Sequence, residues 1–286
     1  MQTVSETLRN AIDSGSPQRV LIVFSDREFT NEDIVLSSGV SLREEFNSEN
    51  DLAIGLTPSS CVSFALLNDA DQLEDFEFGW FTVYLGARIS GITLTEITRV
   101  YTENGSDATY AFVPLGTFYA NKPTVIKKKT INVTAYDRMA YLDVDMPSSE
   151  TLGITYPTDI GTIAEKICTY YDITPVSLEF LNHALEVEEE PDDFNDVSVR
   201  QVIGWIAECA CSIARITRDG KLEFAWFNAT QEEFDENNYS EFSPAWYETN
   251  AINGLYCRDS NNSTDETEGQ TKTNNYLIMD NPFLRG

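Results

Sequence analysis

Apolar positions near the N-terminus recur at helical spacing. Residues three and four apart share one face of a helix, so such a stripe is typical of an amphipathic helix. The stripe consists of Val4, Leu8, Ala11 and Ile12. Gly15 and Pro17 then interrupt it, as residues that end helices do. The sequence therefore predicts a short helix over residues 3–14.

From Arg19 to Asp145 the chain consists of short apolar runs separated by turn residues. Residues 130–136 alternate apolar and polar positions, which is typical of a strand with one buried face. Strands are predicted over residues 20–24, 34–36, 61–67, 80–85, 91–101, 108–123 and 129–136. So many short strands predict a barrel or a sandwich. We assign residues 1–148, including the first helix, to this β domain.

The pattern changes at Met146-Pro147, where helical spacing returns. Two apolar stripes follow, one at Ile160, Ile163, Ala164, Ile167 and Cys168, and one at Val199, Val202, Ile203, Ile206, Ala207 and Ala210. After the second stripe, Asp219-Gly220 separates two apolar runs, which is a β-hairpin signature. Residues 149–230 are therefore predicted to form a central α+β domain.

The last stretch, residues 231–286, is polar and has three strand-like pieces, near Trp246, Leu255 and Tyr276. Strands without partners do not form a stable sheet on their own. We predict a partial second β domain here. The predicted fold class is α+β and β-rich, with an N-terminal β-barrel, a central α+β domain and a partial second β-barrel.

Charge limits the partners that this chain can bind. Its 286 residues are 42% hydrophobic, which is enough for two or three cores, yet 47 Asp and Glu face 19 Lys and Arg, giving a net charge of −28. A surface of this sign repels phosphate, so stable nucleic-acid binding and docking on anionic membranes are both disfavoured. The N-terminus has no signal-peptide pattern, and no apolar stretch reaches the length of a membrane span.

Side chains that usually carry chemistry are sparse. His183 is the single histidine, in an acidic segment without catalytic context, and we expect it to be structural or exposed. Cys209 and Cys211 are two positions apart on a helical run and face different directions, which makes a poor metal site. The five cysteines are odd in number and widely spaced, so free thiols are predicted. No glycine-rich nucleotide motif occurs, and no cofactor is predicted.

Clustered acids leave alternatives open. The acidic run Glu186–Asp196 is predicted to be a solvated loop, and a calcium site is the alternative. The acids Asp69, Asp71, Glu74 and Asp75 resemble a calcium loop loosely but lack its glycine. Lys127–Lys129, a short basic cluster, is predicted to serve a hairpin or a rim contact. Two carboxylates of a glycosidase could lie among so many acids. We nevertheless predict no catalytic, cofactor-binding or metal site, and no enzyme.

Three segments, in this order, resemble the baseplate hub or tail-tip hub proteins of tailed phages and prophages. They are Tyr110–Pro123 followed by Ile131–Met139, then Tyr156-Pro-Thr-Asp-Ile running into Ile167-Cys168, and finally Ser198–Glu208 through Ala214–Phe224. The resemblance spans about residues 3–230. It gives Gly116 and Asp219-Gly220 a role in turns and Pro123 a role in ending a strand, and it gives no residue a catalytic role.

This resemblance implies a structural subunit of the virion tail, made and assembled in the bacterial cytoplasm. It implies a homotrimer, each copy supplying two barrels, that joins the tail tube or distal tail protein to a spike or tip protein around a passage for DNA. The chain departs from the family where a second barrel should begin, near Ser243. Either a truncated chain or an unusually short homologue is expected, which puts trimerisation in doubt. The alternatives are a tail-associated cell-wall hydrolase using paired carboxylates and a host-surface binding module using Trp80, Trp226 or Trp246.

Overall fold

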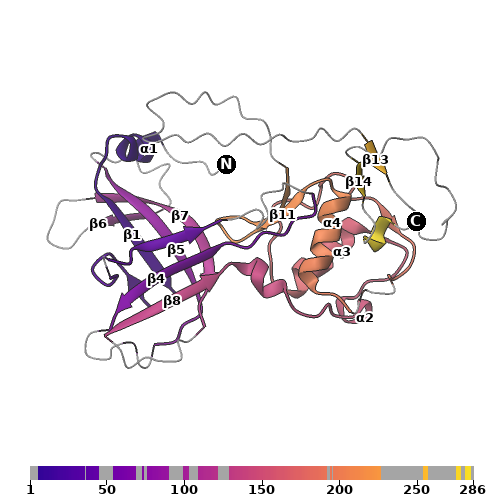
Figure 1. Cartoon of the computed structure of the whole chain (residues 1–286), viewed down its shortest axis with the longest axis horizontal. Helices are drawn as coiled ribbons and strands as arrows, with labels where there is room; N and C mark the ends of the chain where they lie inside the picture. Colours follow the sequence, from indigo (N-terminus) through magenta and orange to yellow (C-terminus); the bar gives the residue numbers. More distant parts are fainter. Residues whose placement is uncertain are drawn as a thin grey trace.

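The structure is a computed structural model in which a large β-sheet and a helical part lie side by side (Figure 1). It describes residues 6–35, 37–44, 54–68, 73, 76–89, 99–102, 109–121, 129–191, 194, 196–226, 254–256, 275–277 and 281–284. No helix among these residues is long and apolar enough to cross a membrane.

The N-terminal part is one antiparallel sheet preceded by a helix. The helix is α1 (Glu6–Asp13), and the strands are β1 (Gln18–Phe24), β2 (Glu28–Phe29), β3 (Val40–Arg43), β4 (Cys61–Leu67), β5 (Trp80–Ile89), β6 (Arg99–Thr102), β7 (Thr109–Tyr119) and β8 (Thr130–Tyr136). Their order is β2-β1-β5-β7-β8-β4-β3, with β6 also paired to β7. The predicted helix and the predicted strand at residues 61–67 are confirmed, the latter at the same bounds.

This sheet folds back on itself over one apolar core. Strands β7 and β8 pair only at Tyr119 and Tyr136. Phe24 and Phe81 from one half of the sheet share a core cluster with Phe64 and Val133 from the other half. Strand β8 alternates strictly between buried and exposed residues, as its sequence predicts. The core therefore lies between the two halves.

The two edges of the sheet are connected by the chain between β2 and β3. Ile34 forms an antiparallel bridge with Leu66 of β4, although β2 pairs with β1 at the opposite edge. Among the described residues, however, the hydrogen-bonded strands do not form a closed ring. A large antiparallel sheet is thus established, and the finer prediction of a barrel is not.

Gly116 lies within β7 rather than in a turn. The register of β5 against β7 shifts so that Val83 pairs with Gly116 and Tyr84 pairs with Pro114, which leaves Leu115 as an extra residue. One extra residue in one strand is a β-bulge. A side chain on Gly116 would have its Cβ 2.6 Å from the ring of Phe118, so only glycine fits there. The expected turn at Gly116 is therefore wrong, because the glycine serves the bulge.

The central part packs two helices against short strands. It contains η2 (Arg138–Leu142), α2 (Ser149–Leu152), β9 (Thr158–Asp159), α3 (Ile160–Tyr170), β10 (Glu186–Val187), α4 (Val199–Cys209), β11 (Ile213–Ile216) and β12 (Leu222–Ala225). The apolar stripes of α3 and α4 form one core. Gly220 adopts a φ of 80° in the turn between β11 and β12. The two predicted helices and the Asp-Gly hairpin are confirmed.

Little of residues 231–286 is described. Strands β13 (Gly254–Tyr256) and β14 (Asn275–Leu277) pair in parallel, and η3 (Pro282–Leu284) follows. The strand-like pieces near Leu255 and Tyr276 are confirmed, and Trp246 lies outside the described residues. Phe283 is buried in the core of the central part. A partial second β-barrel is not established by these elements.

Candidate functional site

The β part and the central part meet where the segment 54–60 reaches α4. In Figure 1 the chain leading into β4 leaves the sheet and runs beside β11. The amide of Gly55 donates to the carbonyl of Ser212 at 2.8 Å, and the amide of Ala214 donates to the carbonyl of Leu56 at 2.9 Å. Segment 54–57 thus runs along the β11 side of the β11–β12 hairpin and is hydrogen-bonded to it. We call residues 54–60, 137–143 and α4 the junction.

The opposite edge of the same hairpin is also covered. The amide of Val176 donates to the carbonyl of Leu222 at 2.8 Å, and the amide of Leu222 donates to the carbonyl of Thr174 at 3.0 Å. Pro175 forms the corresponding parallel bridge. The hairpin therefore lies between a segment of its own part and a segment that belongs to the β part, and both of its edges are hydrogen-bonded.

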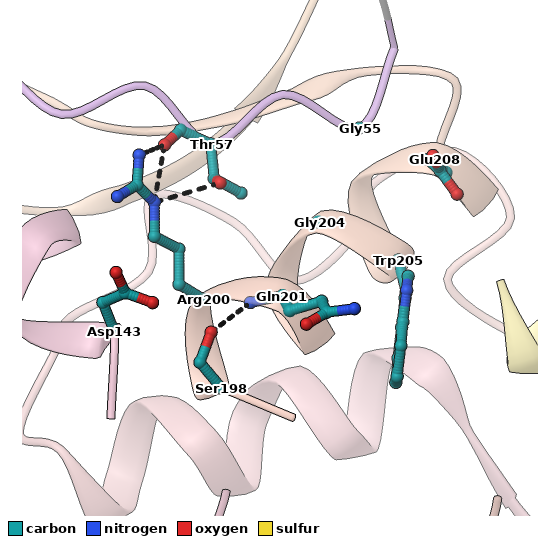
Figure 2. Close-up of a pocket in the computed structure, with 9 residues that line it drawn as sticks. All are labelled: Gly55, Thr57, Asp143, Ser198, Arg200, Gln201, Gly204, Trp205 and Glu208. Atoms are coloured by element: carbon teal, nitrogen blue, oxygen red, sulfur yellow. Dashed lines mark hydrogen bonds between the residues drawn. The ribbon is translucent and has the colours of Figure 1, made fainter. Parts of the chain in front are cut away.

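Arg200 ties the start of α4 to the segment 54–60. Its Nε and Nη2 donate to the carbonyl of Thr57 at 3.0 and 2.6 Å, and Nε also lies 3.2 Å from the Thr57 hydroxyl (Figure 2). Charged donors strengthen such bonds. Ser198 caps the helix beside Arg200, accepting from the amide of Gln201 at 3.2 Å. The helix cap therefore positions the arginine toward the loop.

A helical glycine lets the segment cross α4 closely. Gly204 is buried, and a Cβ built on it would lie 3.1 Å from the carbonyl oxygen of Gly55. Gly55 itself has a φ of 78° and is crowded by the side chain of Glu208. Two glycines at one crossing point remove the bulk that would otherwise separate the backbones.

A cavity of about 430 Å³ opens at this crossing. It is lined by Gly55, Thr57, Asp143, Ser198, Arg200, Gln201, Gly204, Trp205 and Glu208. Its two carboxylates, Asp143 and Glu208, lie at opposite ends with Arg200 and Gln201 between them (Figure 2). Hydrolysis of a glycosidic bond by paired carboxylates needs one carboxyl group on each side of the bond, about 5–10 Å apart. Polar side chains make up most of this lining, so the cavity is suited to polar contacts.

Asp137 connects the end of β8 to the segment 54–60. The carboxylate is 4% exposed and accepts from the Ser59 hydroxyl at 2.8 Å, the Ser60 amide at 2.7 Å and the Met139 amide at 3.0 Å. The amide of Asp137 donates in turn to the carbonyl of Ser60. Burial raises the pKa of this carboxyl above its ordinary value of 3.8, and the hydrogen bonds oppose that shift only in part.

The residues after Asp137 complete the junction. The Arg138 guanidinium lies 4.8 Å from the centre of the Trp80 ring on the β sheet, and it donates to the carbonyl of Asp172 at 2.7 Å. Met139 is fully buried in the core of the central part. Trp80 is 37% exposed and also contacts Tyr119. Three successive side chains thus bind the loop, the sheet and the helical core.

The histidine and cysteines expected to be structural do not converge. His183 is exposed, and its Nδ1 lies 2.9 Å from the carbonyl of Phe180. Cys209 is buried, whereas Cys211 is exposed and has a φ of 48°. The free thiols also include Cys61 and Cys168, while Cys257 lies outside the described residues. Burial raises the pKa of Cys168 to about 11 and that of Cys209 to about 12.

The acidic and basic clusters are only partly described. Within Glu186–Asp196, Val187 and Phe194 are buried, and Glu190 accepts from the Ser149 hydroxyl at 2.8 Å. This run is therefore partly packed, because two apolar residues anchor it. Outside the described residues lie Asp69, Asp71, Glu74, Asp75, Lys127 and Lys128. Across the described ranges, no group of three or more His, Cys, Asp or Glu is arranged to hold a metal.

Sequence reasoning missed the segment 54–60, Asp137 as a buried anchor and the C-terminal Asn281. Trp226, considered for a host-binding surface, is 44% exposed and follows β12. No periodicity marks residues 54–60, since this segment takes its hydrogen-bond partners from far along the chain. The resemblance segment Ile131–Met139, which contains Asp137, was the one available signal.

Comparisons with known proteins are sparse. No protein-family model matches the chain. No curated protein matches it either. Among solved structures it is similar to the 43 kDa tail protein of prophage MuSo2 from Shewanella oneidensis, with a TM-score of 0.40 and 10% identity, over 72% of this chain and 52% of that one. The match thus covers about half of that protein. At this level a likeness establishes neither a shared fold nor a shared activity.

Proposed function

We propose that this protein is a non-enzymatic structural subunit of a phage-type tail or baseplate. The observation that carries the proposal is where the motifs of the resemblance fall. Asp137, Arg200 and Gly204 all belong to those motifs, and each holds the β sheet and the central part together at the junction. Residues that hold the two parts of the chain together would maintain its shape rather than turn over a substrate.

The finer form of the proposal is a hub. In it the folded sheet closes as a barrel, three copies form a ring, and the ring joins the tail tube or distal tail protein to a spike or tip protein. The net charge of −28 supports a DNA passage, since a negative wall repels a polyanion and would not retain it. Location in the virion tail follows from this role.

Assembly with a tube protein tests the proposal. Light scattering is expected to give the chain the mass of a trimer. The chain is also expected to form a complex with the tube or distal tail protein of its own tail. An Arg200→Ala variant should weaken that complex if the junction sets the assembled shape, and Lys166→Ala, on α3 away from the junction, serves as the control. A chain that stays monomeric and joins no tail protein would overturn the hub role.

Absence of catalysis needs its own measurement. Purified cell walls incubated with the chain are expected to show no turnover. Turnover that a single carboxylate substitution abolishes would replace the structural proposal with the hydrolase alternative.

A further inference from the structure

Asn281 and Phe283 are buried between the C-terminal end of α4 and Phe194, in a site that we call the groove. Asn281 is 2% exposed, and its Nδ2 donates to the carbonyl of Trp205 at 2.8 Å and to Glu208 Oε2 at 2.9 Å. The same Nδ2 lies 3.6 Å from Cys209 Sγ. The asparagine amide is therefore recognised on several sides by one short stretch of helix.

Phe283 supplies the apolar half of the contact. It is 5% exposed and meets the Trp205 ring edge-on, with the ring centres 5.9 Å apart. Phe194 lies on another side, with a ring separation of 6.5 Å. Such aromatic pairs add to the stabilisation from burial alone. The segment is thus recognised at two points. The Asn281 amide is bound by hydrogen bonds, and the Phe283 ring fills an apolar site.

The segment also contains a hydrogen bond of its own. The amide of Phe283 donates to Asn281 Oδ1 at 3.0 Å, which is an Asx turn held within the segment itself. A preformed turn loses less conformational entropy on binding. The groove, by contrast, is built from α4 and Phe194, which the Ser198 cap and the central core hold in place. Recognition therefore needs three consecutive residues and a surface distant in sequence.

We propose that this groove is a peptide-docking site for an Asn-Pro-Phe turn, filled here by the chain's own residues 281–283 and open to the same segment of a second copy. About thirty residues separate Ala225 from β13, and a chain of that length can span roughly 90 Å while β13 and β14 stay paired. A neighbouring copy lies well within this reach, because a compact chain of this size has a radius of gyration of about 19 Å. Exchange of identical segments between copies is a low-cost route to association. The inference does not depend on a tail role.

A charge-introducing isostere tests the groove. Asn281→Asp keeps the acceptor for the Phe283 amide, but it removes both donors and places a carboxylate beside Glu208. Undocking should expose Cys209, whose thiol Asn281 covers, while Cys211 is exposed in either state. Alkylation resolved by mass spectrometry should be roughly tenfold faster at Cys209 in the variant, the factor for about 1.4 kcal/mol of lost docking, and unchanged at Cys211.

A synthetic peptide of residues 278–286 then supplies the second copy's segment. Added to the Asn281→Asp chain at up to about 1 mM, the range expected for so short a contact, it should restore the slow alkylation of Cys209. The same peptide carrying Asn281→Asp should not. Restoration by neither peptide, with the circular dichroism of the chain unchanged, would overturn the docking site.

Mixed copies decide whether the occupant is a second chain. An isotopically heavy chain with a photo-crosslinking residue at position 283 is mixed with the light Asn281→Asp chain. Crosslinks from heavy position 283 to light α4 are expected, and they should rise with concentration. If no crosslink joins heavy position 283 to light α4 at any concentration, exchange between copies is overturned.

Discussion

Replacing Asp137 with asparagine tests the junction at its most buried point. The substitution preserves the size of the side chain and removes one charge. In the native chain the two carboxylate oxygens accept three hydrogen bonds, from Ser59, Ser60 and Met139. Asparagine has a single acceptor oxygen. Its amide nitrogen must therefore face a donor, and the least costly choice places it against the amide of Ser60.

The magnitude follows from that one mismatch. A buried donor left without an acceptor costs about 1–3 kcal/mol. Since about 1 kcal/mol lowers Tm by about 2–4 °C in a chain of this size class, we expect Asp137→Asn to lower Tm by between about 2 and 12 °C. Scanning calorimetry of the whole chain measures this directly. Asp143→Asn is the matched control, because Asp143 is exposed at the end of η2 and should shift stability by less than about 0.5 kcal/mol.

The pH dependence provides an independent check. The pKa of Asp137 is raised in the folded chain, so the folded state takes up a proton at a higher pH than the unfolded state does. The stabilisation from this proton is full below the ordinary value of 3.8 and is lost as pH rises through the folded pKa. Native protein should therefore gain stability relative to Asp137→Asn on acidification. A stability difference that shrinks on acidification, or a variant as stable as the Asp143→Asn control, would refute the reasoning.

Three further substitutions probe the same surface, and two of them have a comparison variant. Arg200→Ala removes the bonds to Thr57 and should lower the free energy of unfolding by about 1–2 kcal/mol in urea, whereas Thr57→Val, which loses only the hydroxyl contact, should cost less than about 1 kcal/mol. Gly204→Ala should be destabilising by up to about 2 kcal/mol despite alanine's better helix propensity, because a fixed carbonyl lies 3.1 Å from the new Cβ. Gly79→Ala meets nothing within 4 Å and should be close to neutral. Ser198→Ala removes the cap of α4 and should cost about 1 kcal/mol, seen as a lower urea midpoint.

Local patterns in the sequence predicted the elements well. Strand β8 alternates because only one of its faces packs on the core. The Asp219-Gly220 turn follows from the positive φ that glycine allows. Helix α4 could be predicted because its apolar stripe lies within one short stretch of sequence. These features depend on near neighbours, which the sequence displays directly.

Contacts between distant segments could not be predicted in the same way. Gly55 and Ser212 are bonded across the junction, yet nothing in either stretch names its partner. The side-chain amide of Asn281 donates to α4, a helix more than seventy positions earlier in the sequence. The cavity has the same origin, since Asp143 and Arg200 approach only through the fold. Such sites become visible only once tertiary packing is known.

The hydrogen bonds between segment 54–57 and the β11–β12 hairpin have a mechanical consequence. A hinge formed by one flexible connection would let one part swing while the other stayed still. Here the chain crosses between the parts once before β4 and again at Asp137, and the first crossing is held by backbone hydrogen bonds on both sides of Leu56. Torque applied to the sheet must therefore strain several bonds together before the helices can lag behind, and the two parts should turn as a single stiff body.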